Sequence, residues 1–485
     1  MTVKDLKPSV VWNNFHALTR IPRPSKKESR AVEYLYEFGK SLGLETVKDE
    51  IGNIIIRKPA TPGMENRKGV ILQGHCDMVP QKNPDVEHDF EKDPIETWID
   101  GEWVKAKGTT LGADNGIGVA MAMSVLQSDD IKHGPVEVLV TIDEETGMTG
   151  ANELKPGVLH GDILINLDSE TEGELYIGCA GGVDASASIP YRTEQVPEGW
   201  HHAHLIRVSG CQGGHSGMDI ILCRANANKL LARVLLPLVR DYGVRLASVE
   251  GGNMRNAIPR EAEAVVLIPD GKVGEVDQYL HELLPVLKTE YAVTDPQLYV
   301  GMRACEEPEA CMAEEDALRC MRALLSVPEG VERMSDQMPG MVETSNNTAI
   351  VRTENGKFVI KTLMRSSVDS AKEALTEKMR AVIELAGGTV EFTGGYSGWA
   401  PDAESPVLHT MKSVYEKLYG KTPAVLAIHA GLECGIIGGK YPGLDMVSCG
   451  PTIMSPHSPD ERLHIPSVEK CWNFLKAVLE AVPEK

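Results

Sequence analysis

Histidines and carboxylates that follow short apolar runs are the residues with the clearest chemical potential. His75 and Asp77 stand near the end of the run Val70–Pro80, in which four apolar or extended residues precede Gly74. Residues two apart in a strand point to the same side, so both side chains would leave the same face. A carboxylate in that place can hold the second ring nitrogen of a metal-binding imidazole. On its own, His-x-Asp is also compatible with a polar strand end that enters a loop.

Further candidate ligands recur along the chain. Glu145 and Asp168 follow predicted strands, Asp114 lies just ahead of a predicted helix, and His457 lies in the stretch Gly450–Ser458. Together with His75 they make two imidazoles and three carboxylates, too many for one catalytic zinc with three protein ligands and an open position. If Asp114 bridges two metals, each metal has the bridge, one histidine and one further carboxylate.

Two metal ions that share a bridge have a defined chemistry. At a spacing of about 3.5–4 Å they can deprotonate a shared water and polarise a carbonyl together. Glu144, beside the candidate ligand Glu145, would then be free to act as general base and afterwards as general acid. The alternative is that Asp143-Glu144-Glu145 is a solvated acidic loop. Against that alternative stands the recurrence of candidate ligands at strand and helix ends.

An α/β framework would bring these residues together. Apolar runs and turn residues predict the following strands and helices: helix 28–42, strands 45–48 and 53–57, a strand from 70, helix 116–126, strands 136–142 and 163–167, helix 405–418, strands 424–428 and 445–449, and helix 467–482. Alternating strands and helices indicate a sheet whose reactive groups lie beyond the carboxyl ends of strands. Clustered acidic residues become few between about residues 185 and 395, and the earlier alternation of strands and helices resumes after 395. We therefore predict a catalytic domain, 1–184 and 397–485, interrupted by an inserted domain, 185–396.

Composition narrows the class of protein. A chain of 485 residues is too long for one core, and its 42% hydrophobic and 25% charged residues are ordinary for a globular protein. A net charge of −21 disfavours nucleic acid as a partner. No apolar run could span a bilayer, and residues 1–8 hold no signal-type apolar region. Ten cysteines without a C-x-x-C pair are typical of reduced thiols. We expect a cytoplasmic protein without a membrane partner.

Nine stretches of the chain jointly carry a resemblance. They are HCDMVPQKN, GTTLGADNGIG, TIDEETGM, ILINLDSE, GCAGG, GGHSG, RNAIPREA, HAGLECG and GPTIMSPHSPDE. Taken together they resemble the aminoacyl-histidine dipeptidases, the bacterial carnosinase-type members of the co-catalytic zinc exopeptidases, which also include acetylornithine deacetylase and carboxypeptidase G. The similarity extends from near the N-terminus to the last helix. It implies an α/β fold in which a mixed-sheet zinc-exopeptidase catalytic domain is interrupted by an inserted α+β lid domain.

The resemblance also implies roles for the candidate ligands. His75 and Asp168 would hold one zinc ion, Glu145 and His457 the other, and Asp114 would bridge them. Asp77 would orient His75, and Glu144 would be the general base. The implied cofactors are two zinc ions per subunit, although manganese or cobalt suits the same donors. The implied assembly is a homodimer.

Within the insertion, the motif Gly213-Gly214-His215-Ser216-Gly217 is the second point of interest. Its glycines let the backbone approach a ligand closely, and His215 could donate to a developing oxyanion. A histidine in a glycine-rich surface turn is the alternative, which the resemblance disfavours. Similarity further implies that Asn256 and Arg365 reach the substrate and that Gly431 lines the pocket through its backbone. An arginine fork suits a free C-terminal carboxylate.

The function implied by the resemblance is hydrolysis of dipeptides by a di-zinc-activated water. Xaa-His dipeptides, carnosine-like substrates included, would be cleaved, with Glu144 as the general base. Two other functions fit the same fold: an N-acyl-amino-acid deacylase, and a catalytically silent binding protein. No candidate ligand or base is missing, which disfavours the silent protein. Whether His215 acts in its own subunit or across a dimer is left open by the sequence.

Overall fold

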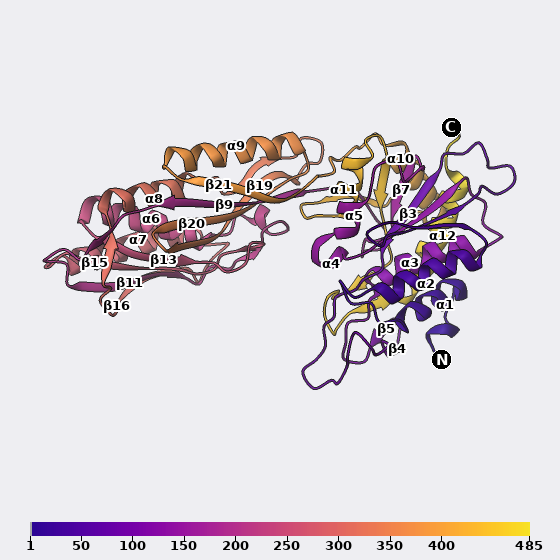
Figure 1. The fold of residues 1–485 in the computed structure, drawn as a ribbon, viewed down its shortest axis with the longest axis horizontal. Coiled ribbons are helices and arrows are strands. Elements are labelled where there is room, and N and C mark those ends of the chain that lie inside the picture. Colours follow the sequence, from indigo (N-terminus) through magenta and orange to yellow (C-terminus); the bar gives the residue numbers. More distant parts are fainter. Residues whose placement is uncertain (1) are drawn as a thin grey trace. The chain divides into compact units, whose positions relative to one another are not determined.

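The computed structural model describes residues 2–485, and the chain divides into two compact units. Unit 1 comprises Met1–Gly178, Trp399–Ala427 and Leu432–Lys485, and unit 2 comprises Cys179–Gly398 and Ile428–Gly431. Figure 1 colours the two units along the sequence. The sequence placed the boundaries at 184/185 and 396/397, and it did not anticipate the return of residues 428–431 to unit 2.

Unit 1 is built on an eight-stranded mixed sheet of order β1-β2-β6-β3-β7-β23-β8-β22. The strands are β1 Glu45–Lys48, β2 Ile54–Lys58, β3 Val70–His75, β6 Val136–Thr141, β7 Ile163–Asn166, β8 Glu174–Cys179, β22 Ala424–Ile428 and β23 Asp445–Ser448. β3 pairs in parallel with β6 and β7. The pairs β1–β2 and β2–β6 are antiparallel. Every residue of β3, β6 and β7 is buried, as expected for central strands covered on both faces. The predicted mixed-sheet α/β architecture is confirmed.

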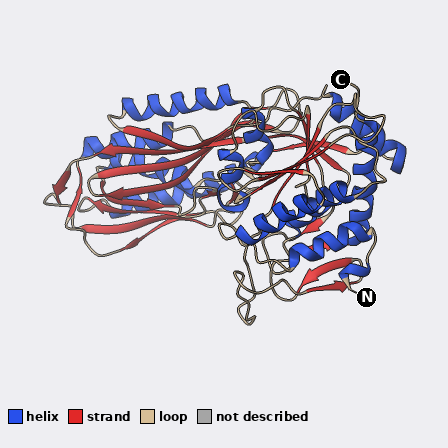
Figure 2. Ribbon diagram, turned by 45° about the vertical axis from the view of Figure 1, so that its right-hand side comes forward, coloured by secondary structure: helices blue, strands red, loops and turns tan. Residues whose placement is uncertain are grey.

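Helices lie against this sheet, as Figure 2 shows in blue. They are α1 Ser9–Thr19, α2 Ser29–Ser41, α3 Ala113–Gln127, α4 Glu144–Gly147, α5 Thr149–Glu153, α10 Pro406–Tyr419, α11 Glu433–Lys440 and α12 Ile465–Ala481, with a 3₁₀ turn at Val3–Asp5. A small sheet of order β24-β25-β5-β4 completes the unit, with strands Ile453–Met454, Arg462–His464, Trp103–Ala106 and Thr97–Asp100. α3 is buried from Ala113 to Leu126, because small and apolar residues surround its whole circumference.

Unit 2 is an antiparallel sheet packed against helices. Its strand order is β16-β11-β15-β13-β19-β20-β9-β21, and β18 pairs with β19. The strands are β9 Gly181–Pro190, β11 His202–Ser209, β13 Arg245–Gly251, β15 Ala262–Ile268, β16 Tyr299–Ala304, β18 Gly330–Met334, β19 Val342–Glu354, β20 Lys357–Ser366 and β21 Thr389–Tyr396. The helices are α6 Ala227–Tyr242, α7 Val273–Glu290, α8 Glu314–Ser326 and α9 Asp369–Leu385.

Two short ribbons and one 3₁₀ turn complete unit 2. β10 Thr193–Gln195 pairs with β17 Ala310–Met312, β12 Gly214–His215 pairs with β14 Ala257–Ile258, and the turn is Ile220–Leu222. The apolar face of α6 packs into the core of the unit together with inward residues of β9, β13 and β15. Among residues 2–485, no helix combines the length and the apolar character that a bilayer span requires.

Candidate functional site

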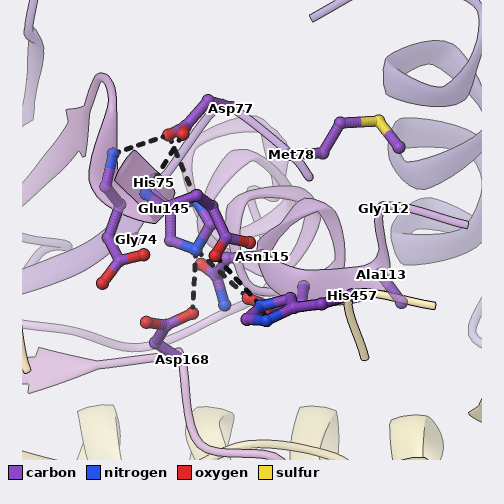
Figure 3. A network of polar contacts seen from close by, with 12 residues as sticks. Gly74, His75, Asp77, Met78, Gly112, Ala113, Asn115, Glu145, Asp168 and His457 are labelled. Carbon is purple, nitrogen blue, oxygen red and sulfur yellow. Dashed lines mark hydrogen bonds and ion pairs between the residues drawn. The ribbon is translucent and has the colours of Figure 1, made fainter. Parts of the chain in front are cut away.

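Five side chains converge at the carboxyl edge of the unit 1 sheet. β3 ends at His75, Asp168 follows β7 by two residues, and Asp114 lies in the first turn of α3. His75 Nε2 lies 3.1 Å from Asp114 Oδ1 and 3.3 Å from Asp168 Oδ1. His457 Nε2 lies 3.1 Å from Asp114 Oδ2 and 3.0 Å from Glu145 Oε2. Asp114 therefore directs one oxygen to each imidazole, as expected of a bridging carboxylate. Figure 3 shows His75, Glu145, Asp168 and His457 gathered in this cluster.

Asp77 organises the residues behind this cluster. Its Oδ1 lies 3.3 Å from His75 Nδ1, and its two oxygens accept the backbone N–H groups of Glu144 and Glu145 at 3.0 and 3.3 Å. The hydroxyl of Ser25 donates to it at 2.7 Å. Burial opposes ionisation, but the hydrogen bond and charge of His75 outweigh it and lower the pKa of Asp77 to about 2. One carboxylate thus orients the imidazole and fixes the start of α4.

Glu144 lies beside the cluster with its side chain unengaged. A carboxylate oxygen of Glu144 lies within 4.8 Å of ligand atoms from His75 and Glu145, and its carboxylate makes no hydrogen bond within residues 2–485. Burial raises the pKa of Glu144 well above its usual range, the charge of His75 opposes this, and other carboxylates reinforce it, namely Asp168, Glu433 and Glu145. A carboxylate that is free of other partners can act as general base and then as general acid.

The donor set fits two divalent cations. Glu145 Oε1 is buried and accepts no hydrogen bond within the described chain. Burial, with a contribution from Asp114, raises the pKa of Asp168 to about 7, and the hydrogen bonds that His457 donates to Asp114 and Glu145 raise the pKa of His457 to about 11. The carboxylates of the cluster are crowded together, and a cation bound among them would offset their mutual repulsion. Imidazole nitrogen together with carboxylate oxygen suits zinc, manganese or cobalt.

Zinc is expected to stabilise the folded chain. After removal of divalent ions with a chelator, added Zn²⁺ should raise the thermal unfolding midpoint, because ions that bind only the folded state contribute about 2.7 kcal/mol per site at a free concentration 100 times Kd. Differential scanning calorimetry measures the shift, and titration calorimetry should give two ions per chain. Mg²⁺ serves as the control and should act more weakly, since it prefers ligand sets made of oxygen alone. A stoichiometry below two would contradict a bridged pair of ions.

In unit 2, the predicted residues His215 and Asn256 are brought together by the ribbon of β12 and β14. Asn256 directly precedes β14, and its carbonyl accepts the N–H of Ser216 at 2.8 Å. His215 Nδ1 accepts the N–H groups of Gly217 and Met218 at 3.2 and 3.1 Å. A nitrogen that accepts two N–H bonds carries no proton, so the proton of the neutral ring resides on Nε2. His215 therefore presents an Nε2–H donor.

Arg365 is a buried cation without an anionic partner. It lies in β20 with 5% of its surface exposed, and within residues 2–485 it forms no ion pair. Nη1 lies 3.3 Å from the hydroxyl of Tyr396, Nη2 lies 3.5 Å from that of Ser216, and Nε has no hydrogen-bond partner. Burying a charge without a partner costs free energy, which a bound anion would offset. The surroundings of Arg365 therefore indicate an anion-binding site.

The segment Ile428–Gly431, which carries the predicted pocket residue Gly431, is fixed against the same part of unit 2. His429 Nε2 lies 2.7 Å from the hydroxyl of Ser345, and a Cβ added at Gly217 would lie 2.1 Å from the carbonyl oxygen of His429. Sequence reasoning missed Ser345, His429 and Tyr396. Isolated serines, histidines and tyrosines carry no spacing pattern, although His429 lies within the stretch HAGLECG that supported the resemblance.

Comparisons with known proteins agree in covering nearly the whole chain. The sequence model described as peptidase family M20/M25/M40 matches residues 71–481. The chain is 46% identical over 483 residues to the cytosol non-specific dipeptidase of Escherichia coli strain K12, spanning 100% of this chain and 99% of that one. The crystal structure of aminoacylhistidine dipeptidase from Vibrio alginolyticus matches with a TM-score of 0.96 at 46% identity, over 100% and 99% of the two chains. The aminopeptidase PepT of Bacillus cereus, 18% identical with a TM-score of 0.57, shares the fold.

Proposed function

This chain belongs to peptidase family M20/M25/M40, as its motifs indicated, and from that premise we propose that it is a metallo-dipeptidase. Its substrates would be dipeptides with a free C-terminus, Xaa-His dipeptides and carnosine-like β-alanyl dipeptides included. The observation that carries the proposal is Asp114, whose two oxygens each lie 3.1 Å from a different imidazole. The names of the two relatives at 46% identity, both dipeptidases, support the substrate class.

Each member of the cluster would have a defined place in the metal centre. We propose that His75 and Asp168 hold one zinc ion, that Glu145 and His457 hold the other, and that Asp114 bridges them. When bound, two such ions polarise a carbonyl and lower the pKa of a water molecule. Asp77 keeps His75 in the orientation that leaves Nε2 free for a metal, because it engages Nδ1.

The reaction would use Glu144 to carry a proton. Its ionised carboxylate would take a proton from the attacking water and then deliver it to the leaving amine, which regenerates the carboxylate. His215, with its proton on Nε2, would donate to the oxyanion, and Asn256 and the backbone of Gly431 would line the substrate pocket. Arg365 would bind the C-terminal carboxylate, which supplies the charge that this buried cation lacks.

A substrate panel tests the proposal. The zinc-loaded chain should hydrolyse Xaa-His and other dipeptides, and should cleave the corresponding dipeptide amides far more slowly, because an amide cannot pair with the Arg365 fork. Initial rates on free dipeptides, dipeptide amides and N-acetyl amino acids measure this. Preference for N-acetyl substrates would identify a deacylase instead, and no turnover of any of them would identify a binding protein.

Assembly and location form the remaining part of the proposal. We propose a homodimer located in the cytoplasm, in which unit 2 serves as the lid or dimerisation domain. The name of the Escherichia coli relative, a cytosol dipeptidase, supports the location. Light scattering of the purified chain measures the assembly, and a monomer at micromolar concentration would contradict it.

A further inference from the structure

Two buried charged side chains next to the metal-site cluster bind only backbone groups. Arg23 is 1% exposed and Glu461 is 2% exposed, and within residues 2–485 neither forms an ion pair. Neither is among the candidate ligands or the candidate base. Buried charges are retained at a cost unless many hydrogen bonds satisfy them, so the partners of these two residues show what they stabilise.

Glu461 binds the loop that presents Asp114. Its Oε2 accepts the N–H groups of Leu111 and Gly112 at 2.7 and 3.0 Å, and its Oε1 accepts those of Ala113 and Asp114 at 2.7 and 3.3 Å. The last two N–H groups belong to the first turn of α3, where the helix provides no acceptor. A carboxylate there also interacts favourably with the helix dipole. One side chain thus fixes four consecutive peptide groups that end at the bridging aspartate.

Arg23 ties the same loop to the end of β3. Its Nη1 donates to the carbonyl oxygens of Cys76 and Asp77 at 3.0 and 3.1 Å, and its Nη2 donates to that of Gly112 at 2.6 Å. The planar fork of an arginine can serve both loops at once, which a lysine ammonium on its flexible stem cannot do in the same geometry. Gly112 is therefore held on both sides, by Arg23 at its carbonyl and by Glu461 at its N–H.

The backbone at Gly112 leaves no room for a side chain. Its φ is +67°, and a Cβ built there would lie 2.6 Å from Arg23 Nη2 and 2.8 Å from the sulfur of Met78. Figure 3 shows Gly112 and Met78 on the side of the cluster where α3 begins. Glycine is required both for the left-handed conformation and for the approach of the guanidinium.

We propose that Arg23 and Glu461 are positioning residues that hold Asp114 in register with His75 and His457, and thereby set the spacing of the two metal ions. This rests on the proposed function, because it presupposes that the cluster binds metal. Arg23 connects Asp114 to the strand end that carries His75. Glu461 lies four residues after His457 in the chain and so connects the loop of that ligand to Asp114. The two charges act on the ligands through the backbone alone.

Zinc affinity of three variants tests the proposal. Arg23→Lys keeps the charge but not the fork, and Glu461→Gln keeps the shape but turns an N–H toward backbone N–H groups. Glu137→Gln is the matched control: Glu137 is 5% exposed, accepts the N–H of His160 at 2.9 Å and pairs with Arg57 at 3.0 Å, and lies in the first half of β6, away from the carboxyl edge.

The expected result separates positioning from general stability. Arg23→Lys and Glu461→Gln should bind Zn²⁺ about 10- to 100-fold more weakly by titration calorimetry, the range seen when residues behind metal ligands are altered. At saturating zinc kcat should fall, while KM for a dipeptide stays within about threefold, because the proposed substrate-binding residues lie in unit 2. Glu137→Gln should lower the thermal midpoint and leave zinc affinity within about twofold.

Two outcomes would overturn the proposal. The first is wild-type zinc affinity in both Arg23→Lys and Glu461→Gln. The second is an equal loss of affinity in Glu137→Gln, which would show that any buried charge matters. If Arg23→Lys or Glu461→Gln fails to fold, Gly112→Ala replaces it, since the Cβ of the new alanine displaces the Arg23 guanidinium without removing it. A wild-type chain that binds two zinc ions but cleaves no dipeptide would refute the proposed function and leave the positioning test intact.

Discussion

Replacement of Glu144 by glutamine is expected to lower kcat by about 10²- to 10⁴-fold, the usual contribution of a general acid–base group, and to leave zinc affinity within about twofold. Glutamine fills the same space but neither accepts nor returns the proton. The backbone N–H of Glu144, which donates to Asp77, is retained, so the start of α4 should not move. Steady-state kinetics with a dipeptide and titration calorimetry with Zn²⁺ measure the two quantities.

The neighbouring carboxylate provides the matched control. Glu145 Oε2 lies 3.0 Å from His457 Nε2, so Glu145→Gln should weaken zinc binding, and its activity should recover in part at high zinc concentration. Glu144→Gln should not recover. Wild-type turnover in Glu144→Gln would exclude Glu144 as the base. Recovery of both variants with added zinc would instead identify Glu144 as another metal ligand.

The clustering of His75, Asp114 and Asp168 could be predicted because each of these candidate ligands stands next to, or at the end of, an element that the sequence pattern indicates. His75 is the last residue of β3 and Asp168 follows β7 by two residues; both strands are buried. Asp114 lies in the first turn of α3, a helix of small and apolar residues. Parallel pairing then brings the carboxyl ends of such strands to one edge. His457 is different. It lies in a loop with a φ of +60°, and only the count of ligands and the resemblance pointed to it.

Contacts to the backbone left no such mark. Arg23 and Glu461 bind backbone carbonyl and N–H groups. Such contacts need no particular partner residue, so no pattern of side-chain types in the sequence reveals them. The return of Ile428–Gly431 to unit 2 is a consequence of tertiary structure and has no compositional boundary. α1 was also missed, although its buried residues Val11, Phe15 and Leu18 follow the helical period and could have revealed it.

Arg365→Met is expected to reduce kcat/KM for free dipeptides strongly and chiefly through KM. Loss of one partner of a buried charge pair costs about 2–5 kcal/mol, which corresponds to roughly 30- to 5,000-fold. The loss should be small for dipeptide amides, which present no carboxylate to the guanidinium. Initial-rate kinetics on each dipeptide and its amide measure the difference.

The same substitution should leave the ligand-free protein as stable as the wild type or more so. Arg365 is buried without an anion, and methionine removes that uncompensated charge at similar volume. Arg245→Met is the matched control in unit 2: Arg245 pairs with Glu314 at 2.8 Å, so its loss should lower the thermal midpoint and spare kcat/KM. An Arg365→Met variant that loses stability and cleaves amides and free dipeptides equally poorly would show a structural role. A stable variant that has lost only the free dipeptides would show that the substrate itself supplies the missing charge.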